Sequence, residues 1–266
     1  MTFTTKQIKH VLKKILKFVL VTAFWLLVWE AASRLISRNN ELLLLILPSP
    51  VTVFKTWLNM GFTPEYLTAA LYTLLRVFLG FFIGSAAGIL IGIVTNLSKI
   101  ADAIISPILK LIRAVPVVAI VILLYLFFKS DVLPIIIVIL MVLPLVWQTV
   151  YDGLGHTDKQ YLEMAKVYKL SRFKTFMQIR LPLIVPSLLS ALINALGLAW
   201  KSGVAAEVIC LPVISLGTIL WSAKGGVDFD KVYAVTLTVV ILSVIIEILL
   251  KQLAKRLMKG RIENEY

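Results

Sequence analysis

The sequence has few charged side chains for its length, and it has still fewer of the residues that build metal and redox sites. Only 15% of its 266 residues are charged and 60% are hydrophobic, whereas a soluble domain is about 25% charged and about 45–50% apolar. A single cysteine, Cys210, excludes an intrachain disulfide and a cysteine-rich metal site. The two histidines, His10 and His156, lie far apart and form no ligand pattern. These shortages indicate a membrane protein and predict no metal site.

Enzyme signatures are absent as well. The sequence contains no G-x-x-x-x-G-K-[ST] phosphate loop, no H-E-x-x-H zinc-binding helix and no nucleophile elbow. We therefore expect no catalytic residue and no cofactor in this chain.

Acidic residues are scarce relative to basic ones, and the excess positive charge is clustered. The chain has 27 Lys and Arg against 14 Asp and Glu, a net charge of +13. Basic clusters beside apolar spans are topology signals, so we expect no nucleic-acid partner. Three such clusters lie at the start, in the middle and at the end of the chain: Lys6, Lys9, Lys13, Lys14 and Lys17; Lys159, Lys166, Lys169, Arg172, Lys174 and Arg180; and Lys251, Lys255, Arg256, Lys259 and Arg261.

Six segments are apolar and long enough to cross a bilayer, which takes about 20 residues as a helix. They cover about residues 15–36, 72–95, 109–128, 132–151, 183–201 and 232–250. A retained first helix is favoured over a cleaved signal peptide, because its hydrophobicity continues through FWLLVWEAASRLI, where Glu30 and Arg34 can pair at i,i+4. The sequence thus predicts an all-α membrane protein with one transmembrane domain over residues 1–266.

The basic clusters set the expected orientation. Six spans put both ends on one side of the membrane, and all three clusters then lie on that side. The positive-inside rule places both termini and the loop over residues 152–182 in the cytoplasm.

Residues 202–223, SGVAAEVICLPVISLGTILWSA, are also apolar enough for a seventh span. A seventh span would move the basic C-terminal tail outside. Gly203, Pro212 and Gly217 interrupt regular helix. We therefore expect a re-entrant or plug-like segment near the outer face, buried in protein.

Glycine recurs at every fourth position of the second span. On a helix this spacing makes a groove in which another helix can approach closely. Packing within the chain is favoured over a functional role for these residues, which are Gly80, Gly84, Gly88 and Gly92.

Ionisable residues at membrane depth are costly and are candidates for a translocation path or gate. Arg76, Lys201 and Glu207 are such residues, and Arg113 and Trp200 are further candidates beside them. Lys201 can instead extend its ammonium group to the outer interface. Glu207 fits a structural buried pair as well as a gate residue.

Residues 163–182, EMAKVYKLSRFKTFMQIRLP, form a basic segment between apolar spans. They predict two short helices, the first propagated by Glu163 and its neighbours and the second capped by Ser171. Pro182 then opens the fifth span. A docking surface for a protein and an amphipathic loop on anionic lipid are both compatible with this pattern. The second helix is expected to display apolar residues on one side: Phe173, Phe176 and Met177.

This segment resembles the EAA loop of ABC-importer permeases, which reads approximately E-A-A-x-x-x-G-x(9)-I-x-L-P. Met164 replaces the second motif position, and Lys169 stands where the family usually has Gly, so the turn there is built differently or is strained. The matching residues are Glu163, Ala165, Ile179, Leu181 and Pro182.

Other stretches are similar to the nitrate/sulfonate/taurine-type branch of these permeases: LPSP at 47–50, TLLRVFLGFFIGSAAGILIGI at 73–93, RAVPVVA at 113–119 and AWKSGVAAE at 199–207. Ile122 and Lys129 depart from that branch, which often has Pro and Gly there. The resemblance implies a small anion such as a sulfonate or nitrate as cargo, with a vitamin precursor or another small metabolite as the alternative.

The resemblance also implies a type I ABC-importer permease fold with three kinds of partner. These are a second permease copy, a cytoplasmic ATP-binding subunit that holds ATP and Mg, and an extracytoplasmic substrate-binding protein or lipoprotein. By resemblance, the residues that couple to the ATPase are Glu163, Met164, Ala165, Lys169, Leu170, Ser171, Phe173, Phe176, Leu181 and Pro182.

Two other classes of protein compete with this interpretation. A secondary transporter should show paired broken helices in an internal repeat, and no repeat is visible. A non-transporting membrane scaffold is the second alternative. A neighbouring gene for an ATPase or a binding protein would argue against both.

Overall fold

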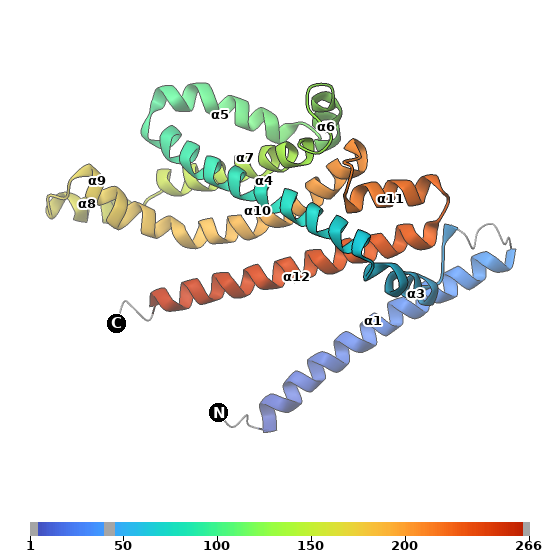
Figure 1. Ribbon diagram of the computed structural model, residues 1–266. Helices are drawn as coiled ribbons and strands as arrows, with labels where there is room; N and C mark the ends of the chain where they lie inside the picture. Colours follow the sequence, from blue (N-terminus) through green and yellow to red (C-terminus); the bar gives the residue numbers. More distant parts are fainter. Residues whose placement is uncertain (1–4, 40–45, 263–266) are drawn as a thin grey trace. The chain divides into compact units, whose positions relative to one another are not determined.

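A computed structural model describes residues 5–39 and 46–262 of the chain (Figure 1). Every secondary-structure element in these ranges is a helix. In order they are α1 Thr5–Asn39, α3 Pro50–Gly61, α4 Pro64–Leu97, α5 Lys99–Ala114, α6 Val117–Tyr125, α7 Leu133–Gly155, α8 Lys159–Val167, α9 Arg172–Thr175, the π-helix η1 Phe176–Arg180, α10 Leu181–Cys210, α11 Leu216–Gly225 and α12 Phe229–Ile262.

Length and composition identify five helices that can cross a membrane, or up to six with one bent pair counted as a span. The bent pair is α5 with α6. The predicted all-α membrane fold with about six spans is confirmed. The five single candidates are Val19–Ile36 in α1, Pro64–Leu97, Leu133–Gly155, Arg172–Cys210 and Phe229–Arg256.

The span expected over residues 109–128 corresponds to this bent pair and not to a single straight helix. α5 and α6 meet at an angle of 103°, and Val115 between them is extended, with φ −82° and ψ 133°. Pro116 follows directly, and proline disfavours the helical conformation of the residue before it. The bend is therefore encoded by this one proline.

The boundary expected at residue 201 also differs. α10 continues through Ser202 and Gly203 to Cys210, and the chain reverses at Leu211, which has φ 52°. Gly203 lies inside α10 and does not break it, and a Cβ at this position would lie 2.7 Å from a Val77 methyl carbon. Its role is close packing. The irregular part of the expected plug is therefore confined to the turn between α10 and α11.

The described chain divides into two compact units. The smaller unit contains α1, α3, the end of α11 and the start of α12. Within it the Trp29 indole N–H donates to the Pro48 carbonyl at 3.1 Å, and the Trp57 indole N–H donates to the Thr238 hydroxyl at 2.9 Å. The expected Glu30–Arg34 ion pair is confirmed, with Nε and Oε1 2.6 Å apart.

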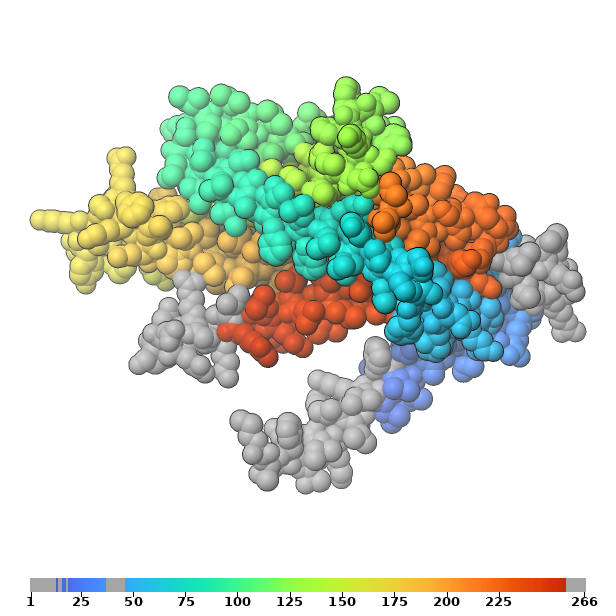
Figure 2. Space-filling model, viewed as in Figure 1, coloured from blue at the N-terminus to red at the C-terminus, as the bar shows by residue number. Residues whose placement is uncertain are grey.

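The larger unit is built on α4, α7 and α10. The glycines of α4 face α7 of the same chain: a Cβ at Gly80 would lie 2.7 Å from Val138 Cβ, and one at Gly88 would lie 2.8 Å from the Leu143 carbonyl oxygen. Side chains larger than hydrogen cannot fit at this contact, so the glycine groove is a packing surface within the chain. The α8–α9 segment (yellow) projects from the rest of this unit (Figure 2).

Candidate functional site

The projecting segment begins with α8. Asp158 caps this helix, its carboxylate accepting from the Gln160 N–H at 3.1 Å. Glu163 is exposed and lies in the middle of α8, not at its first turn. Glu163 is therefore too far from the helix N-terminus to be stabilised by the helix dipole, since a dipole acts mainly within the first and last turns. Glu163 and Met164 remain available to a partner as exposed side chains.

Lys169 adopts the left-handed conformation that glycine favours. Its φ is 51°, the Lys169 N–H donates to the Lys166 carbonyl at 3.0 Å, and the Leu170 N–H donates to the Ala165 carbonyl at 2.9 Å. This is the hydrogen-bond pattern of a Schellman C-cap. The turn has the geometry that a glycine would give, and the lysine side chain adds a strain of about 1–2 kcal/mol.

The second short helix starts as predicted. The Ser171 hydroxyl accepts from the Lys174 N–H at 3.3 Å. Phe173 is 70% exposed, but Phe176 is half-buried and packs against the apolar cluster of Val150, Leu154 and Ile184. The expectation that both rings are displayed is wrong for Phe176, because η1 turns it toward the chain's own core.

The sequence interpretation missed two exposed apolar residues on the same segment. Val167 and Tyr168 are 79% and 73% exposed. They occupy the end of α8, where the turn at Lys169 leaves them pointing outward. Their signal was present as two apolar residues between Lys166 and Lys169, where a solvated surface would be expected to carry polar side chains.

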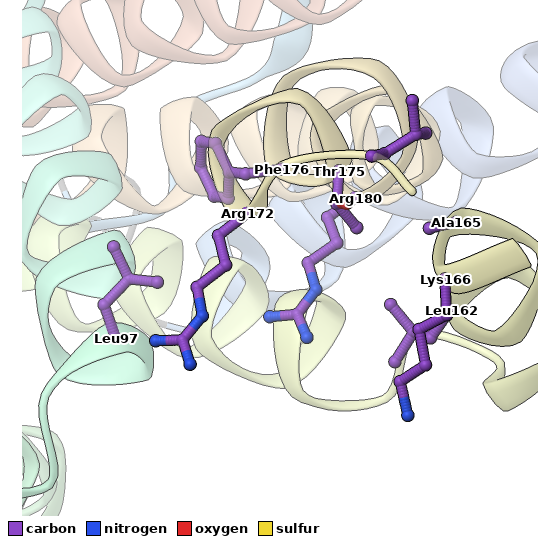
Figure 3. A pocket seen from close by; sticks show the side chains of 9 residues that line it. Leu97, Leu162, Ala165, Lys166, Arg172, Thr175, Phe176 and Arg180 are labelled. Atoms are coloured by element: carbon purple, nitrogen blue, oxygen red, sulfur yellow. The ribbon is translucent and has the colours of Figure 1, made fainter. Parts of the chain in front are cut away.

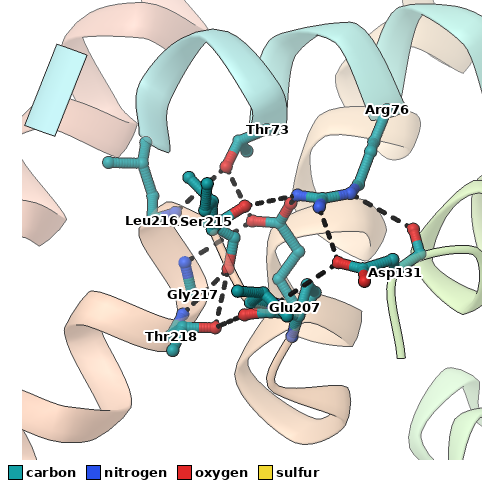
Figure 4. A network of polar contacts seen from close by, with 11 residues as sticks. Thr73, Arg76, Asp131, Glu207, Ser215, Leu216, Gly217 and Thr218 are labelled. Atoms are coloured by element: carbon teal, nitrogen blue, oxygen red, sulfur yellow. Dashed lines mark hydrogen bonds and ion pairs between the residues drawn. The ribbon is translucent and has the colours of Figure 1, made fainter. Parts of the chain in front are cut away.

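A second candidate site is a buried polar network between α4, α10 and the start of α11 (Figure 4). Glu207 is 1% exposed. Its carboxylate accepts from Arg76 Nη1 at 3.1 Å and from the Thr73 hydroxyl at 2.8 Å. The Leu216 N–H donates to the Thr73 hydroxyl at 3.0 Å. Glu207 is therefore paired with Arg76, and both predicted residues belong to one network.

Asp131, in the turn before α7, completes this network and was not predicted. Arg76 Nη2 lies 3.0 Å from Asp131 Oδ1, and Arg76 Nε donates to the Asp131 carbonyl at 3.2 Å. Asp131 also accepts from the Val213 N–H at 3.3 Å. Its only sequence signal is its position as an acidic residue in the short polar break of FFKSDVLP. Nothing in the sequence indicates that it contacts Arg76, which lies far away in the chain.

Gly217 allows α11 to begin directly against α10. A Cβ at this position would lie 2.4 Å from Glu207 Cβ. Arg76 Nη1 donates in addition to the Ile214 carbonyl at 2.8 Å. Two contacts thus hold the segment after Cys210. Arg76, which is paired with Glu207, donates to the Ile214 carbonyl, and the backbone at Gly217 packs against Glu207.

Three other path candidates lie outside this network. Arg113 is exposed and donates to Gln148 Oε1 at 3.4 Å. Trp200 is buried and its indole N–H donates to the Val239 carbonyl at 3.0 Å. Lys201 is exposed and lines a pocket of about 410 Å³ between α10 and α12.

A metal site has no support in the described ranges, where no three His, Cys, Asp or Glu side chains gather closely enough to hold an ion.

Known proteins with similar sequences and folds are membrane subunits of transporters. The chain is 26% identical over 217 residues to the putative aliphatic sulfonates transport permease protein SsuC of Bacillus subtilis, covering 81% of this chain and 78% of that protein. It is 28% identical over 224 residues to the nitrate import permease protein NrtB of Synechococcus elongatus, covering 80% and 77%. A crystal structure of an amino acid ABC transporter with histidines superposes with a TM-score of 0.65 at 18% identity, over 75% of this chain and 98% of that one.

The family assignment rests on a match over more than half of the chain. Residues 80–259 match the family described as binding-protein-dependent transport system inner membrane component. This range contains the glycine groove, the projecting segment, and Asp131 and Glu207 of the polar network, whereas Thr73 and Arg76 lie just before it. The chain therefore belongs to the binding-protein-dependent transport system inner membrane components, the permease subunits of ABC importers.

Proposed function

We propose that this chain is the non-catalytic permease of an ATP-driven importer and that it carries a small anion. The observation that supports coupling to an ATPase is the projecting segment over residues 158–182. It displays Glu163, Tyr168 and Phe173 away from the packed helices. ATP and Mg would be held by the separate subunit that this segment engages.

The projecting segment can pass on motion because it is continuous with the long helix α10. η1 and α10 form one continuous helix with α9, over residues Arg172–Cys210. Movement of the loop by a closing ATPase is therefore transmitted along α10 to Glu207 at its far end. Packed helices respond to such a push by switching between discrete arrangements. We propose that the Arg76–Glu207 pair is the contact that this motion alters near the outer side.

Charge reversal at the loop tests this proposal. In Glu163→Arg, and separately in Phe173→Ala, the permease should insert normally, while copurification of the ATPase falls by at least about tenfold, because an interface hot spot is typically worth about 2 kcal/mol or more and about 1.4 kcal/mol is tenfold. Glu65→Arg is the matched control, since Glu65 is also exposed but lies at the start of α4. Wild-type copurification in both loop variants would favour a loop that lies on lipid.

The anionic cargo is proposed from the names of similar proteins. Relatives are described as permeases for aliphatic sulfonates, nitrate and bicarbonate. A vitamin precursor or another small metabolite is the alternative cargo. Uptake of radiolabelled taurine, nitrate and bicarbonate, by liposomes containing the permease with its ATPase and binding protein, would decide among them. Uptake of none of the three would contradict the anion assignment.

We further propose a second permease copy, an extracytoplasmic binding protein or lipoprotein, and both termini in the cytoplasm. A cysteine at position 262, in a chain without Cys210, should be labelled only from the cytoplasmic side. Labelling from outside would reverse the orientation. The purified chain alone is expected neither to bind nor to hydrolyse ATP, and hydrolysis after rigorous removal of all partners would refute its non-catalytic role.

A further inference from the structure

A pocket of about 430 Å³ lies between the projecting segment and the end of α4 (Figure 3). Its apolar lining includes Leu97, Leu162 and Phe176, and its charged lining is Lys166, Arg172 and Arg180. No acidic side chain lines it in the described part of the chain. The volume falls within the range of about 300–1,000 Å³ that is usual for small-molecule sites.

The three cations line one pocket although they come from three different elements, α8, α9 and η1. Figure 3 shows the guanidinium groups of Arg172 and Arg180 side by side, between Leu97 and Lys166. Within residues 5–39 and 46–262 none of the three forms an ion pair. A topology signal needs only a number of cations on one side of the membrane. Setting the membrane topology does not require these three cations to line the same pocket.

The π-helix η1 produces this alignment. The Leu181 N–H donates to the Phe176 carbonyl, five residues back, so this turn holds one residue more than an α turn. In a regular α-helix, residues eight positions apart point about 80° away from one another. One extra residue reduces that offset to about 20°. Arg172 and Arg180 therefore face the same pocket because of η1, an element type that is rare and frequently functional.

We propose that this pocket binds a phosphate-bearing anion. Arginine presents a planar fork of donors that matches phosphate oxygens, and two such forks with one lysine can neutralise a phosphate group. The apolar walls suit the non-phosphate part of a ligand. Leu97 ends a candidate membrane span, and basic pockets at the cytoplasmic ends of spans can receive phospholipid headgroups. A headgroup and a soluble phosphate share this chemistry.

Binding to the full chain, purified in dodecyl maltoside, tests the proposal. The probes are dihexanoylphosphatidylglycerol, dihexanoylphosphatidylcholine and inorganic phosphate, and the readout is microscale thermophoresis. We expect the anionic lipid to bind and the zwitterionic lipid to bind at least tenfold more weakly. In Arg172→Gln with Arg180→Gln the affinity for the anionic lipid should fall about 25-fold, about fivefold for each cation. Saturable binding of inorganic phosphate at millimolar concentration would identify a soluble phosphate as the source, and binding of the lipid alone would identify the headgroup.

Lys174→Gln is the matched control, because it removes one cation from an exposed position of the same segment that does not line the pocket. It should change the affinity by less than about twofold. Lys166→Gln replaces the double variant if that variant does not fold, with a fivefold loss expected. The proposal is overturned if no probe binds, if the pocket variants bind like the wild type, or if Lys174→Gln loses as much affinity as they do. It is also overturned if the pocket variants no longer bind the ATPase but still bind the anionic lipid. The pocket would then be a site for an acidic side chain of the ATPase.

Discussion

Removal of the Glu207 carboxylate perturbs the polar network most directly. In Glu207→Ala the Arg76 guanidinium loses its most buried partner, while Thr73 keeps the Leu216 N–H. Arg76 still has Asp131 and the Ile214 carbonyl. The variant thus leaves a buried cation partly compensated.

The expected loss of folding free energy depends on the acceptors that Arg76 keeps in this variant. Breaking a buried ion pair by removing one partner typically costs about 3–5 kcal/mol. The lower end applies here, because Arg76 retains three acceptor atoms on Asp131 and Ile214, although the Asp131 side chain is 51% exposed and its charge is screened by solvent. A loss of about 3 kcal/mol corresponds to a fall in Tm of roughly 6–12 °C for a chain of this size. Transport should decline further than assembly does.

Thermal unfolding of the purified chain in detergent, followed by tryptophan fluorescence, measures this effect. Replacing both partners, in Arg76→Met with Glu207→Met, should cost less than the sum of the single changes, since no charge is left buried. Asp131→Asn is the control for a mostly solvated partner and should cost less than about 1 kcal/mol. A Glu207→Ala variant that melts within about 2 °C of the wild type would refute the reasoning. Wild-type uptake by the same variant would show that the network has no part in gating.

Backbone contacts give further predictions. Gly217→Ala should destabilise the chain by about 1–3 kcal/mol, because the new Cβ would meet Glu207, and Gly88→Val should be at least as damaging at the α4–α7 contact. Gly197→Ala is the control for both, since a Cβ there meets nothing within 4 Å, and a loss of Tm equal to that of Gly217→Ala would contradict the steric argument. Lys169→Gly should stabilise the α8 turn by about 1 kcal/mol by removing the left-handed strain. Slower hydrogen exchange of the Leu170 amide would report this, and unchanged exchange would show that the turn is not strained.

Local residue chemistry was sufficient for several features of the fold. The run of apolar segments predicted helices because a bilayer offers backbone groups no hydrogen-bonding water. Ser171 predicted a helix start from its hydroxyl alone, and the Glu30–Arg34 spacing predicted a pair on one helix face. Family membership followed from the EAA-like segment, whose residues are contiguous in the chain.

Features that depend on the direction of a helix or on distant contacts were not predictable in this way. The π turn at η1 buried Phe176 and aligned Arg172 with Arg180, yet one extra residue in a turn leaves no trace in the order of apolar and polar residues. Gly203 read as a helix breaker and instead serves close packing, because its role depends on which helix lies opposite.

The sequence by itself therefore determined the class, the number of spans and the identity of the projecting segment, since these depend on composition and on residues within a few positions of one another. Only the tertiary structure decided that Asp131 joins Arg76 and Glu207, from three points far apart in the chain. A buried charge needs a partner wherever the fold can bring one, and the sequence shows the need for a partner without showing which residue meets it.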